Sequence, residues 1–157
     1  LGLIEQAREM FLQDAEHWYM MALREWQELG DRRSEGDECR QLGVLFHEQK
    51  DLDKAEEWYA KARDVFEEIQ DLNRICRTYG QLGMVAEERD DIAGALLWAG
   101  HTYQLANTNN LEVIVQVKAH LARLKEKHGD ENFTAWWQEF AGEAPPTDLD
   151  VDPETIL

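Results

Sequence analysis

The chain repeats itself every 40 residues. Alanine recurs at this spacing, and a tryptophan follows three residues after each of the first three alanines: Ala15, Ala55, Ala95 and Ala135, with Trp18, Trp58 and Trp98. Around the two central copies, Gln41-Leu42-Gly43 aligns with Gln81-Leu82-Gly83. A fixed period in this range is typical of one supersecondary unit stacked on copies of itself. We therefore expect a repeat array, a class of protein that generally works as a binding surface.

Each repeat has the apolar spacing of helices. Residues 53–70 place Ala55, Tyr59, Ala62 and Phe66 on one face, and Asp53 with Glu56 predicts a cap at the start of this helix. The same face recurs 40 residues before and after. Further helices are predicted over 34–49, 72–89, 111–127 and 131–141. No segment alternates as a strand does. The predicted fold class is all-α, a stack of antiparallel helix hairpins of which the first is incomplete.

Small and aromatic residues indicate how the helices would pack. Gly43 and Gly83 are expected to let the paired helix approach closely, and the alanines to sit where helices cross. The tryptophans at the shared repeat position are expected to stack between hairpins. Of the adjacent pair Trp136 and Trp137, one is expected to be buried, because neighbouring helix residues face different directions.

The composition changes after residue 142. Five acidic residues and no basic residue occupy 143–157, and Pro145, Pro146 and Pro153 oppose helix formation. We predict a repeat array of about three and a half to four hairpins over 1–142, and an acidic, proline-containing disordered tail over 143–157. The last three residues, 155–157, are apolar enough to enter a groove.

The formal net charge of −17, from 16 basic and 33 acidic residues, argues against nucleic acid and anionic membranes as partners. Basic or amphipathic peptides are the complement that this charge allows. No apolar run reaches the roughly 20 residues of a membrane span. Cys39 and Cys76 have no disulfide or metal-ligand spacing, which indicates reduced thiols and a cytoplasmic protein. The start lacks a Met, so we expect a segment of a longer chain.

Leu42, Gly43, Phe46, Ala55, Tyr59 and Ala62 resemble the tetratricopeptide-repeat signature, and the resemblance covers about residues 5–141. The usual repeat has about 34 residues, and HEAT-type repeats have the longer period seen here. The additional residues lie between Ala62 and Leu82, in the second helix and its junction with the next hairpin. This arrangement resembles the lengthened repeats of kinesin light chains and of bacterial STAND signalling ATPases.

The resemblance implies a right-handed superhelical stack whose first helices line a concave groove for a peptide or partner helix. It implies the following partner-binding residues: Arg40, Gln41, Val44, His47, Arg77, Gln81, Met84, His120 and Leu124. We add Arg74, because it lies one helical turn from Arg77 in a chain with few basic residues. Val44, Met84 and Leu124 are spaced by 40 and suit either the apolar face of a partner helix or packing between helices. Glutamines can bond a peptide backbone, and the arginines Arg74 and Arg77 can grip a carboxylate.

Catalysis and metal binding have no support in the sequence. No phosphate loop or nucleophile motif is present, and the adjacent acidic pairs face different directions on their helices. His47, His120 and His128 lie on different predicted helices without His-x-x-x-His spacing, so no metal and no cofactor is expected. We expect a non-enzymatic protein-interaction module. The alternative is a self-associating or intramolecular sensor segment of a larger signalling protein.

Overall fold

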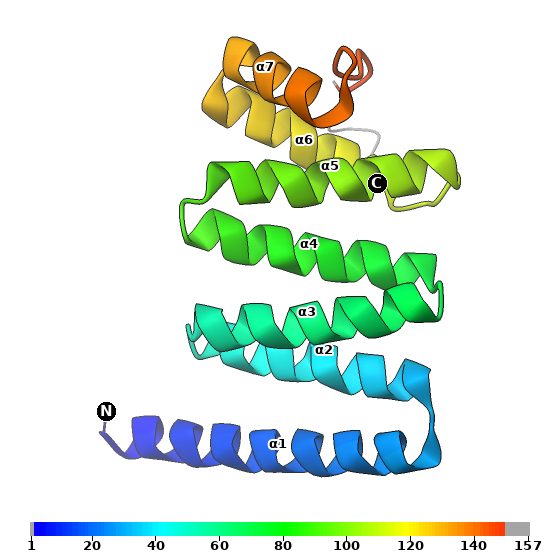
Figure 1. The fold of residues 1–157 in the computed structure, drawn as a ribbon. Helices are drawn as coiled ribbons and strands as arrows, with labels where there is room; N and C mark the ends of the chain where they lie inside the picture. The colour runs from blue at the N-terminus through cyan, green and yellow to red at the C-terminus, as the bar shows by residue number, and fades with distance from the viewer. Residues whose placement is uncertain (1, 150–157) are drawn as a thin grey trace. The chain divides into compact units, whose positions relative to one another are not determined.

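The computed structural model describes residues 2–149, and within them the chain forms seven α-helices and no strand (Figure 1). Their bounds are α1 Gly2–Leu29, α2 Arg32–Glu48, α3 Leu52–Glu68, α4 Leu72–Glu88, α5 Ile92–Thr108, α6 Ile114–His128 and α7 Asp130–Ala141. Helices adjacent in sequence pack on one another, α1 on α2 and α2 on α3 near the start and α5 on α6 and α6 on α7 near the end, so the predicted all-α class of packed helical repeats is confirmed. Two compact units, residues 1–78 and 79–157, divide the chain within α4 and are described separately below.

The helices from α2 to α5 each have 17 residues and begin at residues 32, 52, 72 and 92. Each of them ends in a turn that contains one residue with positive φ: Lys50, Gln70, Asp90 and Asn110. An aspartate follows the first three of these residues. Asp51, for example, accepts a hydrogen bond from the backbone N–H of Lys54 at 3.1 Å. The N-cap of α3 is thus Asp51 and not the predicted Asp53, which lies inside the first turn of the helix.

The α2–α3 hairpin of unit 1 confirms the predicted role of Gly43. A Cβ on Gly43 would lie 2.4 Å from the Cδ1 atom of the Tyr59 ring, so only glycine admits this helix contact. Ala55 and Ala62 are fully buried beside it. Gly83, at the equivalent position of unit 2, is different, because a Cβ there would meet Trp98 Cβ at an ordinary 3.5 Å. The same role predicted for Gly83 is therefore wrong.

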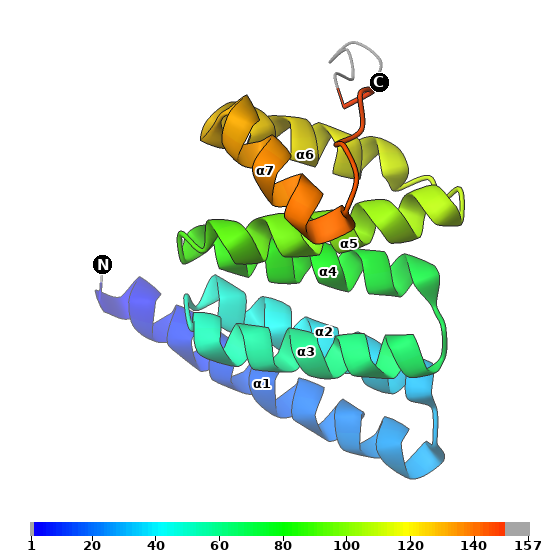
Figure 2. The same cartoon turned by 45° about the horizontal axis from the view of Figure 1, so that its top comes forward.

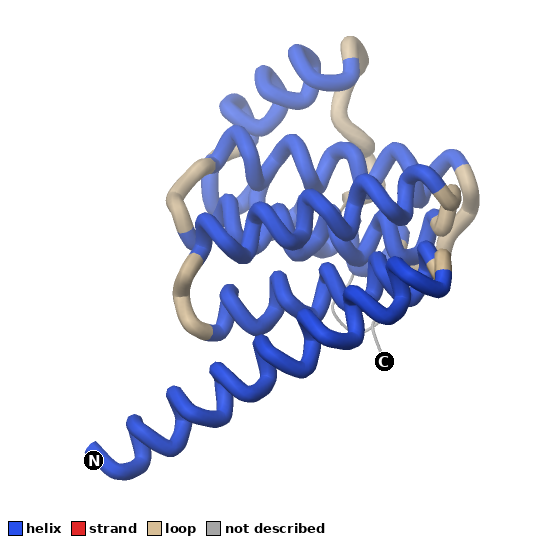
Figure 3. The backbone as a smooth tube through the Cα atoms, turned by 60° about the horizontal axis from the view of Figure 1, so that its bottom comes forward, coloured by secondary structure: helices blue, strands red, loops and turns tan. Residues whose placement is uncertain are grey.

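The first helix agrees with the incomplete first hairpin that the sequence predicts. α1 is one continuous helix of 28 residues, and among the described residues no second helix of its hairpin precedes it. Its C-terminal half packs on α2 through the buried Leu23, and its N-terminal half extends away from α2 (Figure 3). Trp18 is 66% exposed and does not stack between hairpins as predicted, because no helix covers that face of α1.

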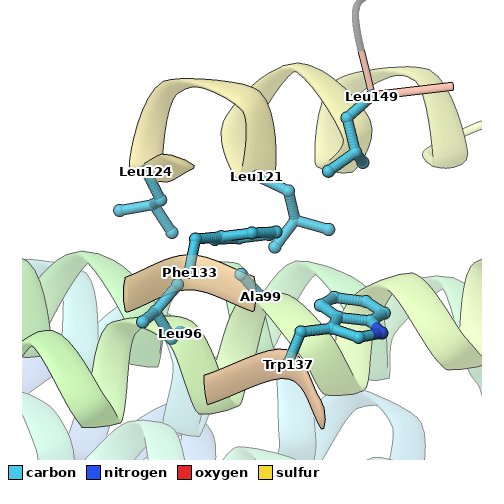
Figure 4. Close-up of a cluster of buried hydrophobic side chains, with 7 residues drawn as sticks. All are labelled: Leu96, Ala99, Leu121, Leu124, Phe133, Trp137 and Leu149. Atoms are coloured by element: carbon cyan, nitrogen blue, oxygen red, sulfur yellow. The ribbon is translucent and has the colours of Figure 1, made fainter. Parts of the chain in front are cut away.

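Unit 2 has a core between α5, α6 and α7 (Figure 4). Its buried side chains are Leu96, Ala99, Leu121, Leu124, Phe133, Trp137 and Leu149. Phe140 of α7 packs against Gly100 of α5, where a Cβ would lie 2.6 Å from the ring. Trp137 is buried and Trp136 is half-buried, which confirms that one member of this pair is internal.

The chain leaves α7 at Gly142, whose left-handed conformation ends the helix. The segment that follows runs back toward α6 (Figure 2), where Asp148 forms an ion pair with Lys118 and Leu149 is 2% exposed in the core. The beginning of the predicted disordered tail is therefore packed as far as Leu149. Residues 150–157, including the apolar end at 155–157, lie outside the described residues.

Candidate functional site

The predicted binding face of unit 1 begins on α2. Arg40, Gln41 and Val44 are half-buried there. The Arg40 Nε atom is buried and has no hydrogen-bond partner among the described residues. His47 faces the second helix of its own hairpin, with its Nδ1 atom 3.5 Å from the hydroxyl of Tyr59 and the two rings edge to face. We infer that His47 contributes to the hairpin interface.

The two arginines at the start of α4 differ in their surroundings. Arg74 bonds Asp37 of α2 through Nε and Nη2, at 2.9 to 3.1 Å, and Asp71 through Nη1 at 2.9 Å. The hydrogen bonds to Asp37 raise the pKa of Arg74 further above its usual value. Arg77 is exposed and makes no ion pair with any described residue. The structure thus gives Arg74 an internal partner set and leaves Arg77 open to a ligand.

The part of α4 within unit 2 carries Gln81 and Met84. Gln81 is half-buried, and its Oε1 atom has no hydrogen-bond partner among the described residues. Met84 is 54% exposed, so its thioether is accessible from outside the protein. Buried polar atoms are nearly always bonded, so the unpaired Gln81 oxygen marks a position where a further polar group would be stabilising.

A charged cluster joins the end of α4 to α6. Glu87 Oε1 lies 2.7 Å from His120 Nε2 and 2.8 Å from Arg123 Nη2. Burial works against ionisation of Glu87, but the hydrogen bonds from Arg123 and His120 outweigh it and lower the pKa of the carboxyl. His120 is therefore engaged by a carboxylate of the protein itself, and this cluster fixes α6 against α4 within unit 2.

Leu124 is 0% exposed and belongs to the core of unit 2, beside Phe133 and Leu121. Of the three apolar positions spaced by 40 residues, Val44, Met84 and Leu124, only Leu124 is completely buried. Val44 is half-buried, and Met84 alone is exposed. The structure thus places Leu124 under the surface, whereas Met84 is accessible to a partner.

A cleft of about 420 Å³, which the sequence did not predict, lies between α1, α2 and α3 in unit 1. Met20, Trp58 and Val65 supply apolar walls. The buried Glu35 at its base is bonded by Arg32 and by Gln27 Nε2, the latter at 3.2 Å. These hydrogen bonds satisfy the Glu35 carboxylate, so this group does not need a charged ligand in the cleft. Lining residues from three helices carry no sequence pattern that could have shown it.

Three properties of the described residues concern thiol reactivity, metal binding and membrane insertion. Burial raises the pKa of both the Cys39 and Cys76 thiols to about 11, so neither is a thiolate at neutral pH. Over residues 2–149, no group of three or more His, Cys, Asp or Glu side chains is placed to hold a metal ion. Within the same range, no helix has both the length and the apolar character needed to cross a membrane.

Comparison with known proteins identifies the repeat. Residues 38–108, from within α2 to the end of α5, match the family model of the tetratricopeptide repeat. A search of curated proteins gives no match to the chain. Residues 38–108 are therefore similar to the tetratricopeptide repeat, an all-helical, non-catalytic repeat family whose members generally mediate protein–protein interaction.

Proposed function

We propose that this chain is a protein-interaction module that binds a peptide or partner helix along one side of α4. The observation that carries the proposal is the spacing of Arg77, Gln81 and Met84. Residues at i, i+4 and i+7 share one side of a helix, so these three form one stripe along α4. The stripe is defined here as Arg77, Gln81 and Met84, and it is called the α4 stripe below.

The α4 stripe offers three kinds of contact, one after another along the helix. The guanidinium of Arg77 has no carboxylate partner among residues 2–149 and can bind a carboxylate bidentately. The amide of Gln81 can bond a peptide backbone, and its Oε1 atom lacks a partner. The thioether of Met84 is exposed and adapts its shape to an apolar side chain.

The partner that fits this order of contacts is an amphipathic helix or peptide with an acidic residue and a large apolar residue about two helical turns apart. The net charge of −17 favours basic residues elsewhere on the same partner. Leu124 and Arg74 have no part in the proposed contact, because the first is in the core and the second is engaged by Asp37 and Asp71.

The test is selection of a binding peptide from a displayed library, followed by affinity measurement with variants of the protein. Arg77→Glu should weaken the selected peptide at least about tenfold, since it replaces an attraction by a repulsion. Met84→Ala should weaken it by about three- to tenfold through lost apolar contact. Arg24→Glu is the matched control. Arg24 is also exposed, and the substitution makes the same change of charge on α1, away from the α4 stripe.

Equal affinity of the peptide for the wild type and for both α4 variants would refute the α4 stripe as the binding surface. Far-UV circular dichroism of each variant checks that the helices are retained. Arg74 is left unchanged in this design, because a carboxylate at that position would face Asp37 and Asp71 and would destabilise unit 1.

A further inference from the structure

Most of the exposed large apolar side chains among the described residues lie on α1. Seven large apolar side chains of this helix are exposed: Leu3, Ile4, Met10, Phe11, Trp18, Met21 and Leu29. Phe11 is 72% exposed, which is rare for an isolated phenylalanine on a soluble protein. Contiguous apolar patches of this kind mark interaction sites.

Four of these side chains, together with Ala7 and Asp14, follow a heptad pattern. Ile4, Ala7, Phe11, Asp14, Trp18 and Met21 are separated alternately by three and four residues, over nearly three heptads. Alternating spacing of three and four residues is the pattern of a coiled-coil seam, which needs a second helix along the same face. We call these six residues the α1 seam. Asp14 is its only charged member.

The body of unit 1 does not cover the α1 seam. α1 is held to α2 on another face, through the buried Leu23 and a hydrogen bond of 3.2 Å from Gln27 Nε2 to Glu35 Oε1. The seam continues into the N-terminal half of α1, which extends past the other helices of unit 1 (Figure 3). A second helix can therefore lie along the seam without displacing α2.

We propose that two copies of this chain associate through their α1 helices, which pair in antiparallel orientation along the α1 seam. In that orientation Ala7 lies opposite Trp18 of the second copy, and Ile4 lies opposite Met21. A small residue thus faces the largest one, which lets side chains of the two helices interdigitate at constant helix separation. The projecting half of each α1 lies along the anchored half of the other.

The charges of α1 select the antiparallel orientation. A parallel pair would put Asp14 directly against Asp14 of the second copy, in an otherwise apolar seam. The antiparallel pair brings Arg8 of the second copy within one helical turn of Asp14, close enough for its long side chain to reach. Both residues are exposed and make no ion pair with a described residue in the single copy.

This pairing relies on unit 1 alone and is independent of the α4 stripe.

Sedimentation equilibrium of the full chain over a range of concentrations tests the proposal. We expect a monomer–dimer equilibrium in the wild type. Phe11→Glu should raise the dimer dissociation constant at least about tenfold, because it puts a carboxylate at the centre of the seam on both copies. The control Gln13→Glu adds the same charge on another face of α1 and should leave the constant within about twofold. A wild type that stays monomeric at high protein concentration would overturn the proposal.

A charge exchange tests the orientation. Arg8→Asp and Asp14→Arg should each raise the dimer dissociation constant at least about fivefold, since each puts like charges together at two symmetric places. The double variant should restore it to within about twofold of the wild type. A double variant as weak as the single variants would rule out the antiparallel pair. Unchanged circular dichroism of each variant separates lost association from unfolding, and peptide binding at the α4 stripe should be unaffected.

Discussion

Replacing Gly43 by alanine tests the packing of the central hairpin most sharply. The added Cβ would lie 2.4 Å from Cδ1 and 2.5 Å from Cε1 of the Tyr59 ring. The ring cannot move aside, because Tyr59 is buried within the α2–α3 hairpin. The two helices would have to separate or the ring would have to leave its rotamer, and overpacking of this kind costs about 1–3 kcal/mol.

An opposing effect sets the net magnitude. Alanine is favoured over glycine inside a helix by about 1 kcal/mol. Gly83→Ala is the matched control, because it makes the same change at the same repeat position with an ordinary 3.5 Å contact to Trp98 Cβ. A contact of 2.4 Å is far inside the van der Waals distance, so we take the upper part of the overpacking range, about 2–3 kcal/mol. After the helix preference of about 1 kcal/mol is subtracted, Gly43→Ala should lower the free energy of unfolding by about 1–2 kcal/mol, and Gly83→Ala should raise it by about 0.5–1 kcal/mol.

The measurement is urea unfolding followed by circular dichroism at the helix band, with the free energies compared at a common m-value. Thermal unfolding should show the same order, since 1 kcal/mol moves the midpoint by about 2–4 °C at this chain length. If Gly43→Ala is as stable as the wild type, or gains stability as Gly83→Ala is expected to, the close helix contact at Gly43 is refuted.

Three further predictions concern buried groups. Leu149→Ala should lower the free energy of unfolding by about 2–3 kcal/mol in urea titration, because the side chain is buried in the core of unit 2; an unchanged midpoint would contradict the packing of this segment. Cys39 and Cys76 should react with a thiol reagent at pH 7–8 far more slowly in the native protein than in urea, since burial raises both pKa values to about 11; equal rates would contradict this burial. The lowered pKa of Glu87 contributes stability above its ordinary value of 4.5, and that contribution is lost as pH falls through the lower folded-state pKa. Glu87→Gln should therefore flatten the acid limb of stability against pH, and an unaltered limb would contradict the cluster.

Much of the fold was predictable because equivalent positions of successive repeats carry the same or similar residues. The 40-residue spacing of Ala55 and Ala95 placed the buried positions of α3 and α5 correctly, and both alanines are internal. The close contact at Gly43 followed from the same alignment. The error at Gly83 has a physical reason. Identical residues at equivalent positions meet different neighbours, and at Gly83 the neighbour is the Cβ of Trp98 and not an aromatic ring.

The ends of the array could be predicted only in part. The sequence predicts an incomplete first hairpin, but the exposure of Trp18 depends on which helices lie beside α1. Residues 143–157 have the composition of a disordered segment, and the burial of Leu149 depends on the side chains of α5, α6 and α7, which composition does not describe. Terminal elements have different neighbours from central ones, so the repeat pattern describes them less well.

The predicted binding residues could be located in the sequence, but the partners and exposure of their side chains could not. Arg74 and Arg77 are three residues apart in the sequence, so they were predicted to lie one helical turn apart and were given one role. Only the structure shows that Arg74 is shared between two carboxylates and that Arg77 is open. The burial of Leu124 has the same explanation, because it depends on α7 and on Leu149, which approach α6 from later in the chain.

Methionine-methyl NMR tests the central claim, that a partner binds along α4, most directly. The chain has four methionines, Met10, Met20, Met21 and Met84, so each methyl signal reports one surface. Titration with a selected peptide should shift the Met84 signal and leave Met10 and Met21 unchanged, whereas raising the protein concentration alone should shift Met10 and Met21. Saturable peptide binding with an unmoved Met84 signal would contradict the assignment of the binding surface to α4.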